Sequence, residues 1–239
     1  FGFSRTVTVL GNAYADVTDL FNASGMARTP TYFGAATLYG DDRSLVEDRR
    51  TTTFYPPWRL AAIRKTADTA RDTDQTVARA NLRRQVEQAL AMVRGGGNVI
   101  TGTDAPIADM AVSIHLNLRA MVTYGFTPHQ ALVTATSAAA DHLNEPLGRI
   151  APGAYADITI VDGDPLTNIN DAAAVDRVLT AGVEHTVDDL LEQFASTGTT
   201  RSATRSVVRE PVPEPKENKR FWWHGLAYVE GARHACCAG

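Results

Sequence analysis

The feature that most constrains the fold is an alternation of strand-like and helix-like segments along the first half of the chain. Short β-branched or aromatic runs lie at 5–10, 29–34 and 98–101, and stretches with apolar residues at helical spacing separate them, at 12–24 and 58–94. Such alternation predicts parallel strands joined by right-handed crossovers. The three predicted strands are too few to close a sheet. The pattern therefore fits part of an eight-stranded α/β barrel or part of an open doubly wound sheet.

The remaining segments are predicted from local composition. Residues 35–57 carry acids, arginines and two adjacent prolines, and we expect a long irregular excursion there. Two helices are expected over 113–124 and 127–143, separated at Gly125. Alternating residues over 156–185 predict sheet strands, and a short helix is expected after them.

Composition excludes several classes of protein. The net charge is −4 and 44% of the residues are hydrophobic, as in ordinary globular proteins. The mild acidity and the scattered arginines argue against a nucleic-acid partner. No apolar run approaches the roughly 18 residues of a membrane span, and no signal peptide is visible. Cys236 and Cys237 are adjacent, so they do not form a disulfide framework.

Asp104 is the sharpest candidate for chemistry. It follows the strand-like run at 98–101, in the sequence Gly-Thr-Asp-Ala-Pro. Barrel enzymes place their chemistry at the carboxyl ends of strands, where a carboxylate can bind a metal or take a proton from metal-bound water. The alternative is that Asp104 only caps a turn before Pro106.

An ordered set of motifs surrounds Asp104. They are Gly-Thr-Asp at 102–104, His-Leu-Asn-Leu at 115–118, Gly-Phe-Thr-Pro-His-Gln-Ala-Leu at 125–132, a Gly, Pro-Gly and Ala-Asp set within 148–157, and Asp162 to Leu166. Over residues 10 to 192 this set resembles the C-terminal portion of the amidohydrolase superfamily, especially its imidazolonepropionase-like and prolidase-like branch. The upstream segments also resemble a secreted branch whose larger members carry a Tol-type β-propeller.

The resemblance implies an α/β fold, and the chain is predicted to divide into three parts. Residues 1–145 would form the last strands and helices of a TIM-type (β/α)8 barrel, and 146–192 would form part of a small β-sandwich. Residues 193–239 lie outside the resemblance, and their composition predicts a Pro/Arg-rich tail with an aromatic C-terminal segment. The missing strands would come from an upstream half of the barrel, from a partner chain or from a homo-oligomer. A secreted or periplasmic location is favoured, with a cytoplasmic one as the alternative.

The resemblance also implies a metal-dependent hydrolase acting on C–N bonds of small-molecule or peptide-like amides. Asp104 would ligate one or two divalent ions, zinc first among them, and would shuttle a proton during attack by water. His115 would lie near the substrate, although a histidine on a helix face is the equal alternative. Asn117 stands where relatives carry a glutamate that we interpret as structural.

The main departure from the family is an absence of ligands. Relatives bind metal mainly with histidines of earlier strands, whereas residues 1–114 contain no histidine. A lone carboxylate does not hold zinc, which takes about four ligands. The later histidines follow the last barrel strand and cannot replace them; they are His129, His142, His185, His224 and His234. Either an upstream segment supplies the ligands, which we favour, or the chain is a non-catalytic remnant acting as a binding or assembly module.

Several weaker motifs have structural interpretations that do not require a binding site. The three glycines at 95–97 follow a helix, so they are predicted to end it rather than to bind phosphate. No Gly-x-Gly-x-x-Gly follows a strand, which disfavours a nucleotide binder. The C-terminal tryptophans, histidines and cysteines over 222–237 are a weak candidate for a small metal or redox site.

The arginines before and within the long helical segment, at 43–50 and 59–84, are predicted to form a solvated helix face. An alternative role concerns the residues nearest the two prolines. Arg49, Arg50, Tyr55 and Trp58 could instead cover the mouth of an active site as a lid.

Overall fold

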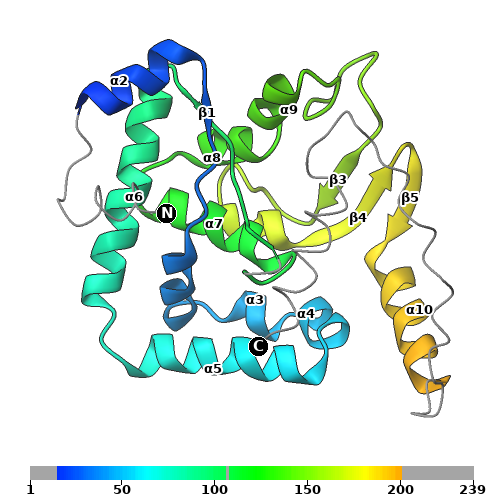
Figure 1. Cartoon of the computed structure of the whole chain (residues 1–239). Helices are drawn as coiled ribbons and strands as arrows, with labels where there is room; N and C mark the ends of the chain where they lie inside the picture. The colour runs from blue at the N-terminus through cyan, green and yellow to red at the C-terminus, as the bar shows by residue number, and fades with distance from the viewer. Residues whose placement is uncertain (1–14, 106–107, 201–239) are drawn as a thin grey trace, which may run out of the picture. The chain divides into compact units, whose positions relative to one another are not determined.

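The computed structural model describes residues 15–105 and 108–200 (Figure 1). The described residues as far as Thr197 form one compact unit, and they contain two separate small sheets. The predicted strand at 5–10 and the aromatic C-terminal segment lie outside the described residues.

A short parallel sheet forms the centre of the first part. Strand β1 (Ala27–Arg28) pairs in parallel with β2 (Asn98–Val99). The contact continues beyond β2, because Ile100 N donates to Arg28 O at 2.9 Å and Gly102 N donates to Pro30 O at 3.1 Å. Helices connect the two strands, which confirms the predicted strand–helix–strand alternation for this pair.

The strand predicted at 29–34 is wrong in its position. Strand β1 precedes it, and Phe33–Gly40 form a 3₁₀ helix, η1. Burial explains the difference: Ala35, Leu38 and Tyr39 of η1 are all buried, and η1 packs on α5 and α6. A short strand in this position would turn half of these apolar side chains away from the core.

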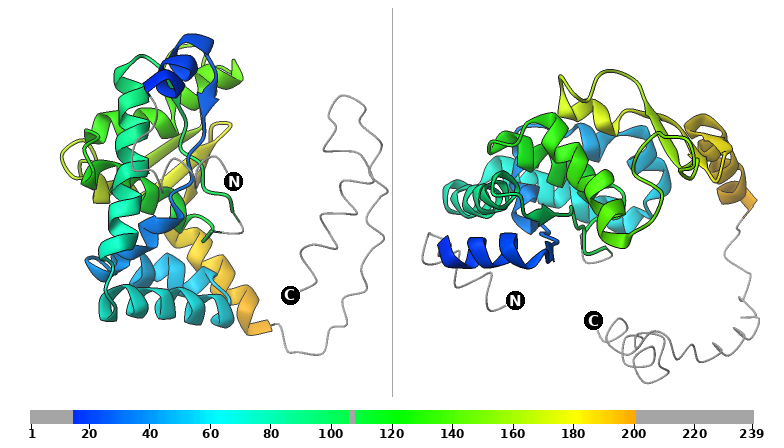
Figure 2. Two further views of the ribbon diagram at one scale, coloured as in Figure 1. Left: turned by 60° about the vertical axis from the view of Figure 1, so that its left-hand side comes forward. Right: turned by 90° about the horizontal axis from the view of Figure 1, so that it is seen from above.

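The two long helices agree with the sequence pattern, with one break. Helix α5 (Pro57–Asp72) and α6 (Thr76–Arg94) occupy the segment that was predicted as helical from 58 to 94. The break between the two helices begins at Thr73, which has an extended backbone (φ −124°, ψ 157°). Helix α2 (Ala15–Ser24) ends before Gly25, as expected, and Figure 2 shows it beside α6.

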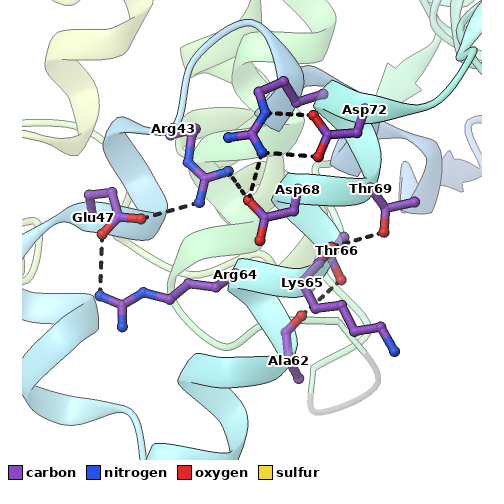
Figure 3. A network of polar contacts seen from close by, with 10 residues as sticks. Arg43, Glu47, Ala62, Arg64, Lys65, Thr66, Asp68, Thr69 and Asp72 are labelled. Atoms are coloured by element: carbon purple, nitrogen blue, oxygen red, sulfur yellow. Dashed lines mark hydrogen bonds and ion pairs between the residues drawn. The ribbon is translucent and has the colours of Figure 1, made fainter.

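Residues 35–57 are not the irregular excursion that the sequence suggested. They form most of η1 and two short helices, α3 (Ser44–Glu47) and α4 (Arg49–Phe54). An ion-pair network ties α3 to α5: Glu47 binds Arg43 and Arg64 at 3.3 and 3.2 Å, and Arg43 also binds Asp68 at 2.7 Å (Figure 3). Because these pairs are partly exposed, they add little stability, and the buried Leu45 and Val46 of α3 anchor the segment in the core.

Three further helices follow β2. Helix α7 (Val112–Thr123) contributes Leu116, Leu118 and Met121 to the core. Helix α8 (Pro128–Ala135) begins with a capping box between Thr127 and Gln130, and α9 is Ser137–Leu143. The single helix expected over 127–143 is thus divided at Thr136, whose ψ of −93° is not helical.

The second sheet is antiparallel, in the order β3-β4-β5. Its strands are β3 (Ile158–Val161), β4 (Val175–Thr180) and β5 (Val183–Thr186), with the 3₁₀ helix η2 (Ile169–Ala173) before β4 and α10 (Val187–Thr200) after β5. The described residues form one layer here, so the predicted β-sandwich is not confirmed. The three-part division at 145 and 192 stays a prediction.

None of the described helices is long and apolar enough to cross a membrane.

We predict that Gly102→Ala destabilises the protein by about 1 to 3 kcal/mol. An added Cβ would lie 2.7 Å from Thr29 Cγ2 and 3.0 Å from Thr31 Oγ1, so it would push the two parallel segments apart. Chemical denaturation measures the change in the free energy of unfolding. Gly34→Ala is the matched control, because the nearest atom to its Cβ, Leu82 Cβ, is 3.5 Å away. Equal effects of the two substitutions would contradict this account.

We also predict that residues 1–239 alone do not unfold as a cooperative monomer. Within the described part the parallel sheet has only two strands, and such a sheet is marginal by itself. Large apolar side chains are also exposed, among them Trp58 (70%) and Ile150 (86%). Analytical ultracentrifugation with thermal denaturation tests this, and a monomer with a single sharp transition would contradict it.

Candidate functional site

Asp104 lies at the carboxyl end of the parallel pair. The last backbone contact of the pair joins Gly102 to Pro30, and Asp104 follows two residues later, exposed to solvent. Its φ of 50° is left-handed, a conformation that aspartate tolerates better than most residues. The location agrees with the strand-end position that the sequence predicted, and its role stays a prediction.

The segment before Asp104 is held from two helices. Asn117 of α7 is 2% exposed, and its side-chain amide donates to Gly102 O at 2.6 Å. Thr101 N donates to Thr134 O of α8 at 3.0 Å. An ionised glutamate in place of Asn117 has no proton to donate to this carbonyl. The departure at Asn117 therefore has a local structural consequence that the sequence did not reveal.

The segment after Asp104 is held from the α4–α5 corner. Asp109 forms an ion pair with Arg59 at 2.8 Å, and the Tyr55 hydroxyl donates to Met110 O at 2.6 Å. Burial raises the pKa of Asp109, and Arg59 opposes that rise. Burial and the Asp109 charge raise the pKa of Tyr55 to about 12, so the phenol remains a neutral donor at physiological pH.

A buried polar cluster adjoins the contacts of Asp109 with Arg59 and of Met110 with Tyr55. Tyr39 is 1% exposed, and burial together with the Asp109 charge raises its pKa. Its hydroxyl has no hydrogen-bond partner among the described residues. Arg119 of α7 pairs with Asp42 at 2.9 Å and also donates to Ser44 Oγ at 3.1 Å. The end of η1 and the start of α3 are thereby joined to α7.

His115 lies on α7 in largely buried surroundings. Desolvation, followed by the positive charges of Arg50 and Arg119, lowers its pKa to about 4, and the charge of Asp48 opposes the shift. The ring is therefore neutral at physiological pH, and its Nδ1 is buried with no partner in the described part. The two predicted site residues thus lie in different settings, one in an exposed loop and one within a helix.

The described residues do not form a metal site by themselves. No group of three His, Cys, Asp or Glu side chains among them is arranged to hold a metal ion. His129, His142 and His185 are exposed on α8, α9 and β5. His224, His234 and the two cysteines lie outside the described residues.

The arginines are not all on a solvated face. Arg50 pairs with Asp48 at 2.6 Å and donates to Val175 O at 3.3 Å, and Arg59 is largely withdrawn from solvent beside Asp109. For these two the prediction was wrong, because each is neutralised by a carboxylate. Asp109 was the residue that the sequence reasoning missed; its position five residues after Asp104 was the available signal.

Comparison with known proteins adds a family. The pattern of the amidohydrolase family matches residues 11–184, and no curated protein matches the chain. Similar solved structures are an amidohydrolase (22% identity, TM-score 0.47, 74% of this chain and 38% of that one), a Xaa-Pro dipeptidase with bound methionine (21%, 0.47, 77% and 42%) and molinate hydrolase (16%, 0.46, 84% and 43%). The chain spans about two fifths of their lengths.

We predict that His115 contributes to the loss of stability in acid. Because its folded-state pKa of about 4 lies below the ordinary value of 6.5, the unfolded chain takes up a proton in this window that the folded protein does not. As the pH is lowered through this window, protonation of His115 in the unfolded chain should reduce the free energy of unfolding by up to about 1.4 kcal/mol per pH unit. Denaturation of His115→Gln between these pH values should show a shallower slope.

His129→Gln is the matched control for this measurement, because His129 is exposed on α8. That variant should keep the slope of the unmodified protein. Identical slopes for the unmodified protein and His115→Gln would show that His115 does not titrate as its burial requires.

Proposed function

Because this chain belongs to the amidohydrolase family, we propose that it is the C-terminal portion of a metal-dependent hydrolase that cleaves C–N bonds in amide or peptide-like substrates. The observation that carries the proposal is the position of Asp104, just beyond the parallel contact between Gly102 and Pro30. Strand ends of this kind are where α/β barrels place their chemistry.

The proposed architecture extends what the described residues form. The parallel pair β1–β2 would be two neighbouring strands of a TIM-type (β/α)8 barrel, and the antiparallel sheet would be one part of a β-sandwich beside it. The remaining strands would come from an upstream half or from a partner chain, with a homo-oligomer as a further arrangement. Such a partner would also cover the edges of the short parallel sheet.

Asp104 and His115 have separate proposed roles. The exposed carboxylate of Asp104 would accept a proton from the attacking water and return it to the leaving nitrogen. Asp104 would also contribute one metal ligand. The neutral ring of His115 would contact the substrate by hydrogen bonding, which its low pKa allows without adding a charge.

The described residues alone do not fit a zinc ion, since Asp104 belongs to no group of three or more potential ligands among them. The proposed enzyme therefore needs histidines from outside this sequence for its one or two divalent ions. The alternative function is a non-catalytic amidohydrolase remnant that binds or assembles with other proteins, which the lack of histidine in residues 1–114 favours. A secreted or periplasmic location, rather than a cytoplasmic one, is proposed from the family resemblance.

We predict that Asp104→Asn lowers amide hydrolysis by roughly 100- to 10,000-fold. The substitution keeps the shape of the side chain but removes its ability to take up a proton. The assay uses the protein with its upstream segment, zinc and a panel of amide and dipeptide substrates. Asp141→Asn is the control, because Asp141 is an exposed carboxylate on α9 that pairs with Arg149.

Zinc analysis separates the two candidate functions. Stoichiometric zinc in the longer protein, but not in residues 1–239 alone, is expected for the enzyme. Stoichiometric zinc on residues 1–239 alone would contradict our account of the ligands. Full activity of Asp104→Asn would remove Asp104 from the mechanism.

A further inference from the structure

We propose that Arg59 and Tyr55 are positioning residues for Asp104, acting through a clamp on the loop that carries it. The inference rests on the proposed function. The clamp consists of the Arg59–Asp109 ion pair at 2.8 Å and the hydrogen bond from the Tyr55 hydroxyl to Met110 O at 2.6 Å. Neither residue carries out chemistry in this proposal.

The Arg59–Asp109 pair is better shielded than most ion pairs of this chain. The side chains are 28% and 22% exposed, whereas those of Arg83–Glu87 are 65% and 46% exposed. It also joins residues 50 positions apart, while Arg83 and Glu87 are neighbours on one helix. Shielded pairs are weakened less by solvent and salt, so this one can hold two segments together.

The α4–α5 corner presents both clamp residues from a rigid support. Tyr55 caps the end of α4, Arg59 lies in the first turn of α5, and Pro56 and Pro57 stand between them. Proline fixes φ, so the corner has few conformations to lose on forming these contacts. The corner therefore holds the two donors, Arg59 and Tyr55, at a fixed spacing that matches the consecutive acceptors Asp109 and Met110.

The end of the loop has a conformation that needs such support. Ala111 has a φ of 62°, which is sterically unfavourable for an alanine and persists where surrounding contacts enforce it. Ser113 N donates to Asp109 O at 3.0 Å, which joins the clamp to the start of α7. The strained residue thus lies between two anchored points.

The backbone connects the clamp to Asp104. Ala108 N donates to Asp104 O at 3.3 Å, directly before the clamped Asp109. At the other end of the loop, Asn117 of the same helix, α7, binds Gly102 O. Asp104 is therefore held between two anchored ends, and release of Asp109 would free one of them.

A double-mutant cycle tests the proposal in the protein with its upstream segment. Arg59→Gln and Asp109→Asn should each lower kcat by roughly 10- to 100-fold, the loss expected for small misplacement of a catalytic group. KM should change by less than about 2-fold, because substrate binding is not the affected step. The double variant should be no worse than the poorer single variant.

Two further variants exclude a general effect on folding. Arg59→Lys keeps the charge and should recover part of kcat. Arg64→Gln is the matched control: Arg64 lies on the same helix and pairs with Glu47 at 3.2 Å, outside the clamp. Its kcat should equal that of the unmodified protein. The proposal would be overturned if the double variant lost kcat by the product of the two single losses. An unchanged kcat in Arg59→Gln would also overturn it.

Amide hydrogen exchange gives a readout without activity. Exchange at Ala108 and Ser113 should be faster in Arg59→Gln than in Arg64→Gln, because the bonds to Asp104 O and Asp109 O would open more often. Equal exchange would overturn the clamp itself. If the unmodified protein hydrolyses no amide, the proposed function fails and the catalytic assignment falls with it, whereas faster exchange in the same protein would show that the clamp exists.

Discussion

The parallel backbone contact between the segments after β1 and β2 is the constraint on which the candidate site depends. It continues through Ile100 and Gly102, whose amides donate to Arg28 O and Pro30 O. Gly102 has no side chain where Thr29 and Thr31 approach most closely, so the two segments can run together to the point where the loop begins. The direction in which the chain leaves the sheet, and hence the place of Asp104, follows from this contact.

Much of this could be predicted from sequence because the signals are local. The capping box at Thr127, the stop at Gly25 and the apolar stripe of α6 each depend on neighbours within a few residues. Asp104 was predicted for a similar reason, since it follows a strand-like run directly. The error at 29–34 arose where burial in a helical layer outweighed a local β preference.

The remaining features depend on contacts between distant residues. Arg59 looked like part of a solvated face, and only the fold brings it to Asp109. The segment over 35–57 looked irregular because its order comes from packing against distant helices, through core residues such as Tyr39, Leu45 and Val46. The low pKa of His115 likewise reflects burial on α7 and nearby arginines, which no spacing in the sequence records.

Family membership and local structure constrain the chemistry in different ways. The family pattern covers Asp104 and its surroundings, but the described residues do not place Asp104 in a group of three or more potential metal ligands. The same loop is nevertheless held at Gly102, Asp109 and Met110 by side chains from three different elements. A remnant that no longer needed a placed carboxylate would have no use for a strained Ala111 within such a loop. The anchoring of this loop at Asp109 and Met110 therefore supports the proposed enzyme over the assembly module.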